Sequence, residues 1–182
     1  MKATGIVRRI DDLGRVVIPK EMRKTLRIKE GDPLEIYTDL DQLVFKKYSP
    51  IISIDGYAKM VAEGLTQLID KPCAVTDTDK IVHISLFKNK DYVDKELSSD
   101  YQKAIRDRKS LILNKTDGSK ILPLVDGDDI QLENQIFVPI IANGDCYGSI
   151  CVFDKEKENK FNSSDVKLVQ MAAIFVSKQF EQ

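Results

Sequence analysis

The chain has 182 residues, of which 42% are apolar and 31% are charged, and its formal net charge is −1. This size and composition predict one or two compact cytoplasmic domains and exclude a disordered or fibrous protein. No apolar run approaches the roughly 18 residues that a membrane-spanning helix needs. The first residues lack the apolar segment of a signal peptide, so we expect neither membrane insertion nor export.

The first 29 residues concentrate positive charge. They hold nine basic side chains against three acidic ones, a net charge of +6 within a chain whose total is −1. Such a cluster is typical of a surface that binds a polyanion. A charge run alone is also typical of a solvated face, so the choice depends on the elements that carry these charges.

Five short elements are expected in the first fifty residues. Two strands flank a turn whose residues tolerate tight backbone geometry, and Pro19 ends the second strand. Met22 and Leu26 give the following helix an apolar stripe, and a hairpin comes after it. The expected bounds are 5–10 and 15–18 for the strands, 20–26 for the helix, and 34–38 and 43–47 for the hairpin.

These elements bury little apolar surface within one chain and leave strand edges open. An intertwined dimer, in which two chains complete one β-barrel, would remove both problems. It would also double the basic surface with two-fold symmetry. That symmetry suits two-fold related half-sites on DNA.

Residues 4–26, TGIVRRIDDLGRVVIPKEMRKTL, followed by Gly31-Asp32 and Leu34-Glu-Ile36, resemble the AbrB-type swapped-hairpin domain. The resemblance covers nearly all of residues 1–48. It implies an interleaved dimer that binds double-stranded DNA through basic residues of the first strand, the loop and the short helix. The implied contacts are Arg8, Arg15, Arg23 and Lys24, with Lys2, Arg9, Lys20 and Arg27 as a second group.

Two of these positions have alternatives. Arg15 could instead close its turn through a salt bridge to Asp11 or Asp12. Lys24 stands where the family pattern has arginine, and lysine keeps the charge but cannot form a planar bidentate contact. We therefore expect phosphate contact at Lys24. The helix is too short to fill a groove alone, so the arginines are expected to read DNA shape as well as base edges.

The Ser49-Pro50 pair marks a boundary, so we expect a DNA-binding domain at residues 1–50 and a second domain at 51–182. Asn143-Gly144 between two strongly apolar runs is typical of a tight hairpin, and Asn162 with Asp165 is typical of a helix start. The expected bounds are helices 54–69, 92–108 and 164–180, strands 73–76, 80–84, 135–141 and 147–153, and a short strand near 120–122.

This order of elements predicts an α+β domain. The apolar positions of the last helix wrap more than one face, which predicts packing on its own sheet and on a second copy. The run from Val138 to Phe153 resembles the final hairpin of GAF-type sensor domains. That resemblance covers about residues 53–182 and implies a regulatory domain that oligomerises and can bind a small effector, whose site residues are unknown.

An AbrB-like domain followed by a GAF-like domain resembles a family of regulators of forespore genes in endospore-forming bacteria. The resemblance implies a homo-oligomer, with a dimer formed through the first domain and a tetramer through the second. It also implies activation and repression of genes during sporulation. We therefore expect a transcription regulator rather than an enzyme.

Two other functions compete with this one. MazE-type antitoxins resemble the N-terminal region more weakly and also bind a partner protein. They usually carry a disordered tail, whereas residues 53–182 are expected to fold. A GAF-type thiol redox enzyme would use a cysteine, but Cys151 alternates within an apolar strand and Cys146 is next to Asp145, which does not favour a reactive thiolate.

No metal or cofactor is expected. The three cysteines are too few and too widely spaced for a disulfide framework or, with the single histidine His83, for a zinc site. Residues 126–129, Asp-Gly-Asp-Asp, lack the spaced acids of a calcium loop and are expected to form a solvated turn.

Overall fold

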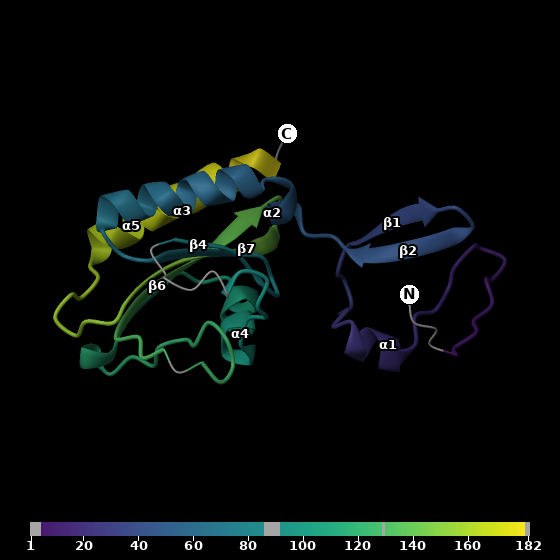
Figure 1. Ribbon diagram of the computed structural model, residues 1–182, viewed down its shortest axis with the longest axis horizontal. Coiled ribbons are helices and arrows are strands. Elements are labelled where there is room, and N and C mark those ends of the chain that lie inside the picture. Colours follow the sequence, from purple (N-terminus) through teal and green to yellow (C-terminus); the bar gives the residue numbers. More distant parts are fainter. Residues whose placement is uncertain (1–4, 86–91, 129, 181–182) are drawn as a thin grey trace. The chain divides into compact units, whose positions relative to one another are not determined.

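The computed structural model describes residues 5–85, 92–128 and 130–180 (Figure 1). The chain divides into two compact units, Met1–Tyr48 and Ser49–Gln182. Each unit has its own secondary structure and its own packing.

The first unit consists of a short helix and a hairpin. Helix α1 spans Lys20–Thr25, and strands β1 (Leu34–Asp39) and β2 (Gln42–Lys47) pair antiparallel. The helix begins after Pro19, whose carbonyl accepts a hydrogen bond of 2.9 Å from the N–H of Arg23. The hairpin turns at Leu40, whose φ of 52° is left-handed. The sequence predictions of a helix and a hairpin here are confirmed.

The two strands predicted at residues 5–10 and 15–18 are wrong for a single chain, because this segment is irregular up to α1. Only the turn between them forms, closed by hydrogen bonds from Asp11 N–H to the Arg15 carbonyl (3.1 Å) and from Gly14 N–H to the Asp11 carbonyl (3.0 Å). A strand needs a neighbour for its backbone groups. Among the described residues, β1 and β2 pair only with each other, so no strand pairs with this segment there.

The second unit is built on a five-stranded antiparallel sheet in the order β4-β3-β7-β6-β5. The strands are β3 (Cys73–Thr76), β4 (Ile81–Ser85), β5 (Leu111–Asn114), β6 (Asn134–Ala142) and β7 (Asp145–Asp154). Helices α3 (Asp55–Ile69) and α5 (Ser163–Ser177) cover one face and α4 (Ser99–Asp107) covers the other (Figure 1). The remaining short helices are α2 (Pro50–Ser53), η2 (Lys115–Asp117) and η3 (Lys178–Phe180).

Both faces of the sheet are covered, so its central strands are apolar on both sides. On β6, Ile136 packs with α3 and α5, whereas Phe137 packs with α4. On β7, Val152 and Phe153 divide in the same way. This alternation explains why the two strands read as near-continuous apolar runs.

Most predictions for the second unit are confirmed. Helix 54–69, strands 73–76 and 80–84, and the long hairpin at 135–153 all form within one or two residues of their expected bounds. Asn143 and Gly144 both have positive φ, as a tight hairpin turn requires. The Asn162 side chain caps α5, and Asp165 bonds back to the N–H of Asn162, so the predicted capping start is also confirmed.

The helix predicted at 92–108 is wrong in its first part, because α4 begins only at Ser99. The Ser98 hydroxyl accepts the N–H of Tyr101 and caps the helix there. The preceding residues bond to β4 instead: Ile81 N–H donates to the Lys95 carbonyl, and Asp94 N–H to the Ile81 carbonyl. These sheet-edge bonds compete with the first helical turns.

The short strand predicted near 120–122 is also wrong, and β5 forms earlier, at Leu111–Asn114. The backbone N–H and carbonyl of Leu122 bond to the amide side chain of Gln135 instead of to a neighbouring strand. The Gln135 amide accepts the Leu122 N–H and donates to the Leu122 carbonyl, each at 3.0 Å. None of the helices in the ranges described above is long and apolar enough to span a membrane.

Candidate nucleic-acid interface

The basic side chains singled out from the sequence are exposed on the first unit. Arg8, Arg9 and Arg15 lie on the irregular segment before α1, and Arg27 follows the helix. Lys20, Arg23 and Lys24 lie on α1. Lys2 lies outside the described residues. The unit therefore presents seven of the eight candidates to solvent.

Helix α1 gathers these charges because of its spacing. Lys20 lies three residues before Arg23 and four before Lys24, which brings these three side chains to neighbouring positions on the helix. Arg27 lies just beyond the end of α1. Arg23 and Lys24 lie in the last turn of α1, where the helix dipole favours cations. No residue of α1 is fully buried, so this short helix is available as a basic surface.

Arg15 forms the ion pair that was the alternative to DNA contact. Its Nε lies 2.8 Å from Asp11 Oδ2, and its backbone N–H donates to Asp11 Oδ1 at 2.7 Å. These two hydrogen bonds, the backbone one first, lower the pKa of Asp11 from its usual value. The Arg15 side chain is still 70% exposed. The pair therefore fixes the turn and leaves the arginine accessible to a ligand.

The thiols of the second unit are not arranged for nucleophilic chemistry. Burial raises the pKa of Cys151 to about 12, against the opposing effect of a hydrogen bond from Gln135 Nε2. Burial also raises the pKa of Cys73 and Cys146. A nucleophilic cysteine needs the opposite shift. Over the described ranges, no group of three or more His, Cys, Asp or Glu side chains could hold a metal ion.

An open cavity of about 760 Å³ lies where the loop that follows Leu124 meets the segment before α4. The Lys95 ammonium lies 4.1 Å from the centre of the Tyr92 ring at this site. The space between the sheet and α4 is instead filled by buried side chains, including Tyr101, Phe137 and Phe153. The cavity is lined by Tyr92, Lys95, Val125, Asp126, Gly127, Asp128, Ile130, Gln131 and Lys155.

Comparisons with known protein families divide the chain at the same region. Residues 53–181 match the family described as stage V sporulation protein T C-terminal, transcription factor. Residues 7–53 match the family described as antidote-toxin recognition MazE, bacterial antitoxin.

Two curated relatives from Bacillus subtilis (strain 168) and one solved structure are similar to this chain. Stage V sporulation protein T is 42% identical over 183 residues, covering 100% of both chains. The transition state regulatory protein AbrB is 62% identical over 50 residues, covering 28% of this chain and 52% of AbrB. The GAF-B domain of DevS from Mycobacterium smegmatis superposes with a TM-score of 0.52 at 15% identity, covering 69% of this chain and 96% of that domain. This last similarity concerns the fold alone.

Proposed function

The chain belongs to the stage V sporulation protein T family of transcription factors, and from this premise we propose that it activates and represses forespore genes by binding their promoters. Its first unit is AbrB-like and its second is GAF-like. The observation that carries the proposal is the exposed basic surface of the first unit, at the positions where the AbrB resemblance places DNA contacts. DNA-binding of this kind takes place in the cytoplasm.

We propose that Arg8, Arg15, Arg23 and Lys24 contact double-stranded DNA directly, with Arg9, Lys20, Arg27 and Lys2 adding phosphate contacts. Arginine supplies a planar fork that fits phosphate and guanine edges. Asp11 has a supporting role here, because its bonds to Arg15 hold that side chain at the turn.

The active form is proposed to be a homo-oligomer. The hairpin of the first unit exposes an apolar face that a second chain would cover as an interleaved dimer. In the second unit, α5 exposes Met171, Ile174 and Phe175, and the neighbouring α3 exposes Met60 and Leu68. A second copy packed on this outer helical face would join two dimers into a tetramer.

We also propose that the second unit binds a small effector. Because the core beneath α4 is filled by its own side chains, an effector would bind first at the open cavity beside Tyr92 and Lys95.

The antitoxin alternative has one observation in its favour, the match of residues 7–53 to an antitoxin family. The 42% identity to stage V sporulation protein T over the full length and the folded second unit outweigh it. The raised thiol pKa values do not favour the redox alternative.

The test is a titration of the full chain into a fluorescent promoter duplex and a scrambled duplex at several salt concentrations. Arg15→Ala and Arg23→Ala should each weaken binding, and each should flatten the plot of log affinity against log salt by about one unit per lost contact per site. Lys46→Ala is the matched control, because Lys46 is an exposed cation of β2 outside the proposed contacts.

Wild-type protein that binds neither duplex at low salt, while folded and oligomeric, would refute the proposal. If wild type binds DNA but Lys46→Ala lowers the affinity as much as Arg15→Ala does, the assignment of these residues is refuted.

A further inference from the structure

The second unit carries a small basic surface of its own at the end of α4. Residues 49–182 contain seventeen basic residues, but only two of them, Arg106 and Arg108, are arginines. Lys103 and Lys109 flank them, so that residues 103–109 have a net charge of +3. The remainder of residues 49–182 has a net charge of −7. We call Lys103, Arg106, Arg108 and Lys109 the α4 basic surface.

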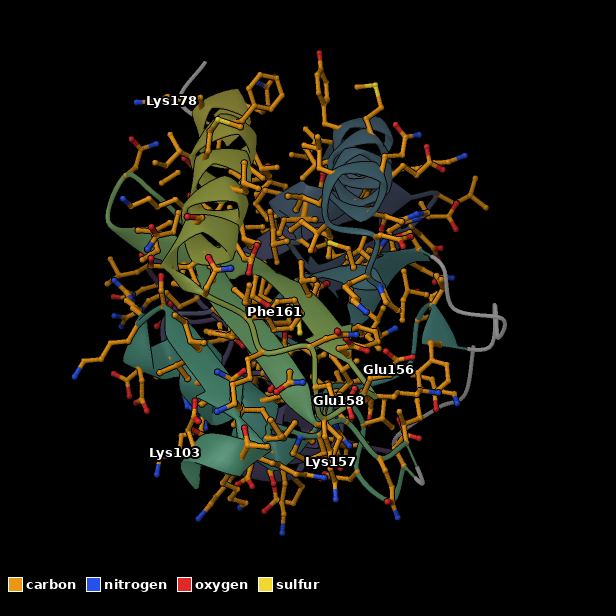
Figure 2. All side chains as sticks on the ribbon, turned by 90° about the vertical axis from the view of Figure 1, so that its left-hand side faces the viewer. Lys103, Glu156, Lys157, Glu158, Phe161 and Lys178 are labelled. Atoms are coloured by element: carbon orange, nitrogen blue, oxygen red, sulfur yellow. The ribbon has the colours of Figure 1, made fainter. Side chains whose placement is uncertain are left out.

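The packing of α4 turns this surface outward. Tyr101, Ala104 and Ile105 form the buried side of the helix against the sheet. Lys103 and Arg106 lie on the opposite side of the helix from Tyr101 and are exposed, and Figure 2 shows Lys103 at the edge of the unit, pointing away from it. Arg108 ends the helix with a left-handed φ of 55°, and its guanidinium donates to the carbonyl of Gly144 in the β6–β7 turn. The end of the helix is thereby held in place.

Two neighbouring lysines form close ion pairs, whereas Lys103 interacts with Asp100 only at longer range, where it adds to the effect of Lys120 in lowering the pKa of that carboxyl. Lys115 pairs with Glu133 at 2.9 Å, and Lys120 pairs with Asp100 at 2.7 Å. Within the part of the chain that the structure describes, Lys103, Arg106 and Lys109 have no carboxylate oxygen within 4.0 Å. Asp107 is the one acid within the surface, and it is exposed.

Helix stability does not require this arrangement. Cations in the last turn of a helix interact favourably with its dipole, but the effect is modest and falls off within that turn. Lysine would serve it as well as arginine. Arg108 has a structural reason in its bond to the Gly144 carbonyl. Arg106 has no such bond among the described residues, and its exposed fork beside Lys103 and Lys109, in a domain of opposite net charge, fits the planar, bidentate geometry of phosphate.

We propose that the α4 basic surface binds the phosphate backbone of the DNA that the first unit recognises. This inference rests on the proposed function and extends it: the second unit adds sequence-independent affinity, and the first unit reads the sequence. Phosphate contacts fix the position of a protein on the duplex without carrying sequence information. They make affinity depend strongly on salt.

The experiment compares two double variants of the full chain that each lose two positive charges. Lys103→Gln/Arg106→Gln removes half of the surface. Lys80→Gln/Lys157→Gln is the control, because Lys80 and Lys157 are exposed cations elsewhere on the same unit. Both proteins are titrated into the promoter duplex and the scrambled duplex over a range of salt concentrations. Circular dichroism establishes that both variants are folded. The four substituted side chains are all exposed, so the substitutions should not disturb the core.

The expected result is that Lys103→Gln/Arg106→Gln weakens binding to both duplexes by a similar factor and flattens the salt dependence by roughly two units per chain, one for each lost phosphate contact. The control should leave the slope nearly unchanged. Arg106→Lys should fall between wild type and the double variant, because it keeps the charge but loses the fork.

If the two double variants have the same slope and affinity while wild type binds promoter DNA, the α4 proposal is overturned and the proposed function stands. A surface that serves an acidic protein partner would give this outcome. If wild type binds no duplex, the proposed function fails first, and the α4 proposal fails with it.

Discussion

The two units use the same local element, an antiparallel hairpin with a two-residue turn, in opposite ways. In the first unit, β1 and β2 place Leu34, Ile36, Leu43 and Phe45 on one face by their register. Ile36, Leu43 and Phe45 are 59%, 63% and 47% exposed. In the second unit, β6 and β7 have helices on one face and α4 with its adjoining loops on the other, and their central residues are buried.

The difference shows where each core must come from. A two-stranded hairpin is marginal in water unless its apolar face is covered. The second unit covers its hairpin with elements of the same chain, so its core is complete in one copy. Over its described residues, the first unit has no such cover, and no strand pairs with its segment before α1. A second chain could both pair with the segment before α1 and cover the apolar face of the hairpin.

The largest effect is expected from a substitution that breaks the complete core. Gly148 lies where β7 approaches β3: a Cβ there would lie 1.9 Å from the Thr76 carbonyl oxygen and 2.7 Å from Ile51 Cδ1. Backbone cannot yield as a flexible side chain can, so Gly148→Ala should lower the free energy of unfolding by about 3 kcal/mol or more. Urea unfolding followed by circular dichroism measures this, since the chain has no tryptophan.

Gly144→Ala is the control for that experiment. Gly144 lies at the tip of the same hairpin with φ of +83°, and nothing lies within 4 Å of its Cβ position. Only the left-handed backbone is then strained, at a cost of about 1–2 kcal/mol. Equal destabilisation by the two variants would mean that the close approach of β3 and β7 does not limit this position.

A smaller effect is expected from a substitution that breaks the incomplete core. Ile36→Asp places a charge on the apolar face of β1, which costs little if that face meets water. If a second chain covers the face, the variant should lose the burial of an isoleucine, about 1.5–3 kcal/mol per chain, and with it the first-unit dimer. Sedimentation equilibrium should show the number of copies halved, and promoter binding should weaken in parallel.

Glu35→Gln is the control for this face, because Glu35 is the next residue along β1 and points to the opposite side of the hairpin. It should leave the assembly intact. Unchanged mass for Ile36→Asp would contradict the interleaved dimer and would leave the exposed face of the first unit unexplained.

The sequence predicted those elements whose signal is local. The β6–β7 hairpin, the α5 capping box and the β1–β2 hairpin all depend on residues a few positions apart, such as Asn143-Gly144 and Asn162 with Asp165. The helix predicted at 92–108 was wrong because the competing bonds to Ile81 join segments about fourteen residues apart. β5 was missed for a related reason: it exists only as the partner of β6.

The candidate DNA contacts could be predicted only in part. Exposure of Arg23 and Lys24 follows from their positions on the short helix α1, whereas Arg8 is exposed on a segment that the sequence predicted to be a strand. A salt bridge of Arg15 to Asp11 or Asp12 was one of the alternatives from the sequence, and the turn geometry selects Asp11. The α4 basic surface was not predicted, because the average charge of the second unit is negative. The two arginines Arg106 and Arg108, close together in the sequence, were a signal that could have indicated it.

The smallest effect is expected from changes at the cysteines of the second unit. Because the core of that unit is complete within one chain, the state of its thiols should not alter DNA binding. Because burial raises the pKa of Cys151 to about 12, this thiol stays protonated at pH 8 and should react with a thiol reagent only after unfolding. Cys146 is only partly buried, so it should react first. Cys146→Ser should leave promoter affinity within about twofold of wild type, because Cys146 packs only at the margin of the core and serine is similar in size. Rapid labelling of Cys151 in the native protein would mean that the second unit opens during function. Loss of promoter binding in Cys146→Ser would likewise mean that the core of this unit does not behave as a rigid scaffold.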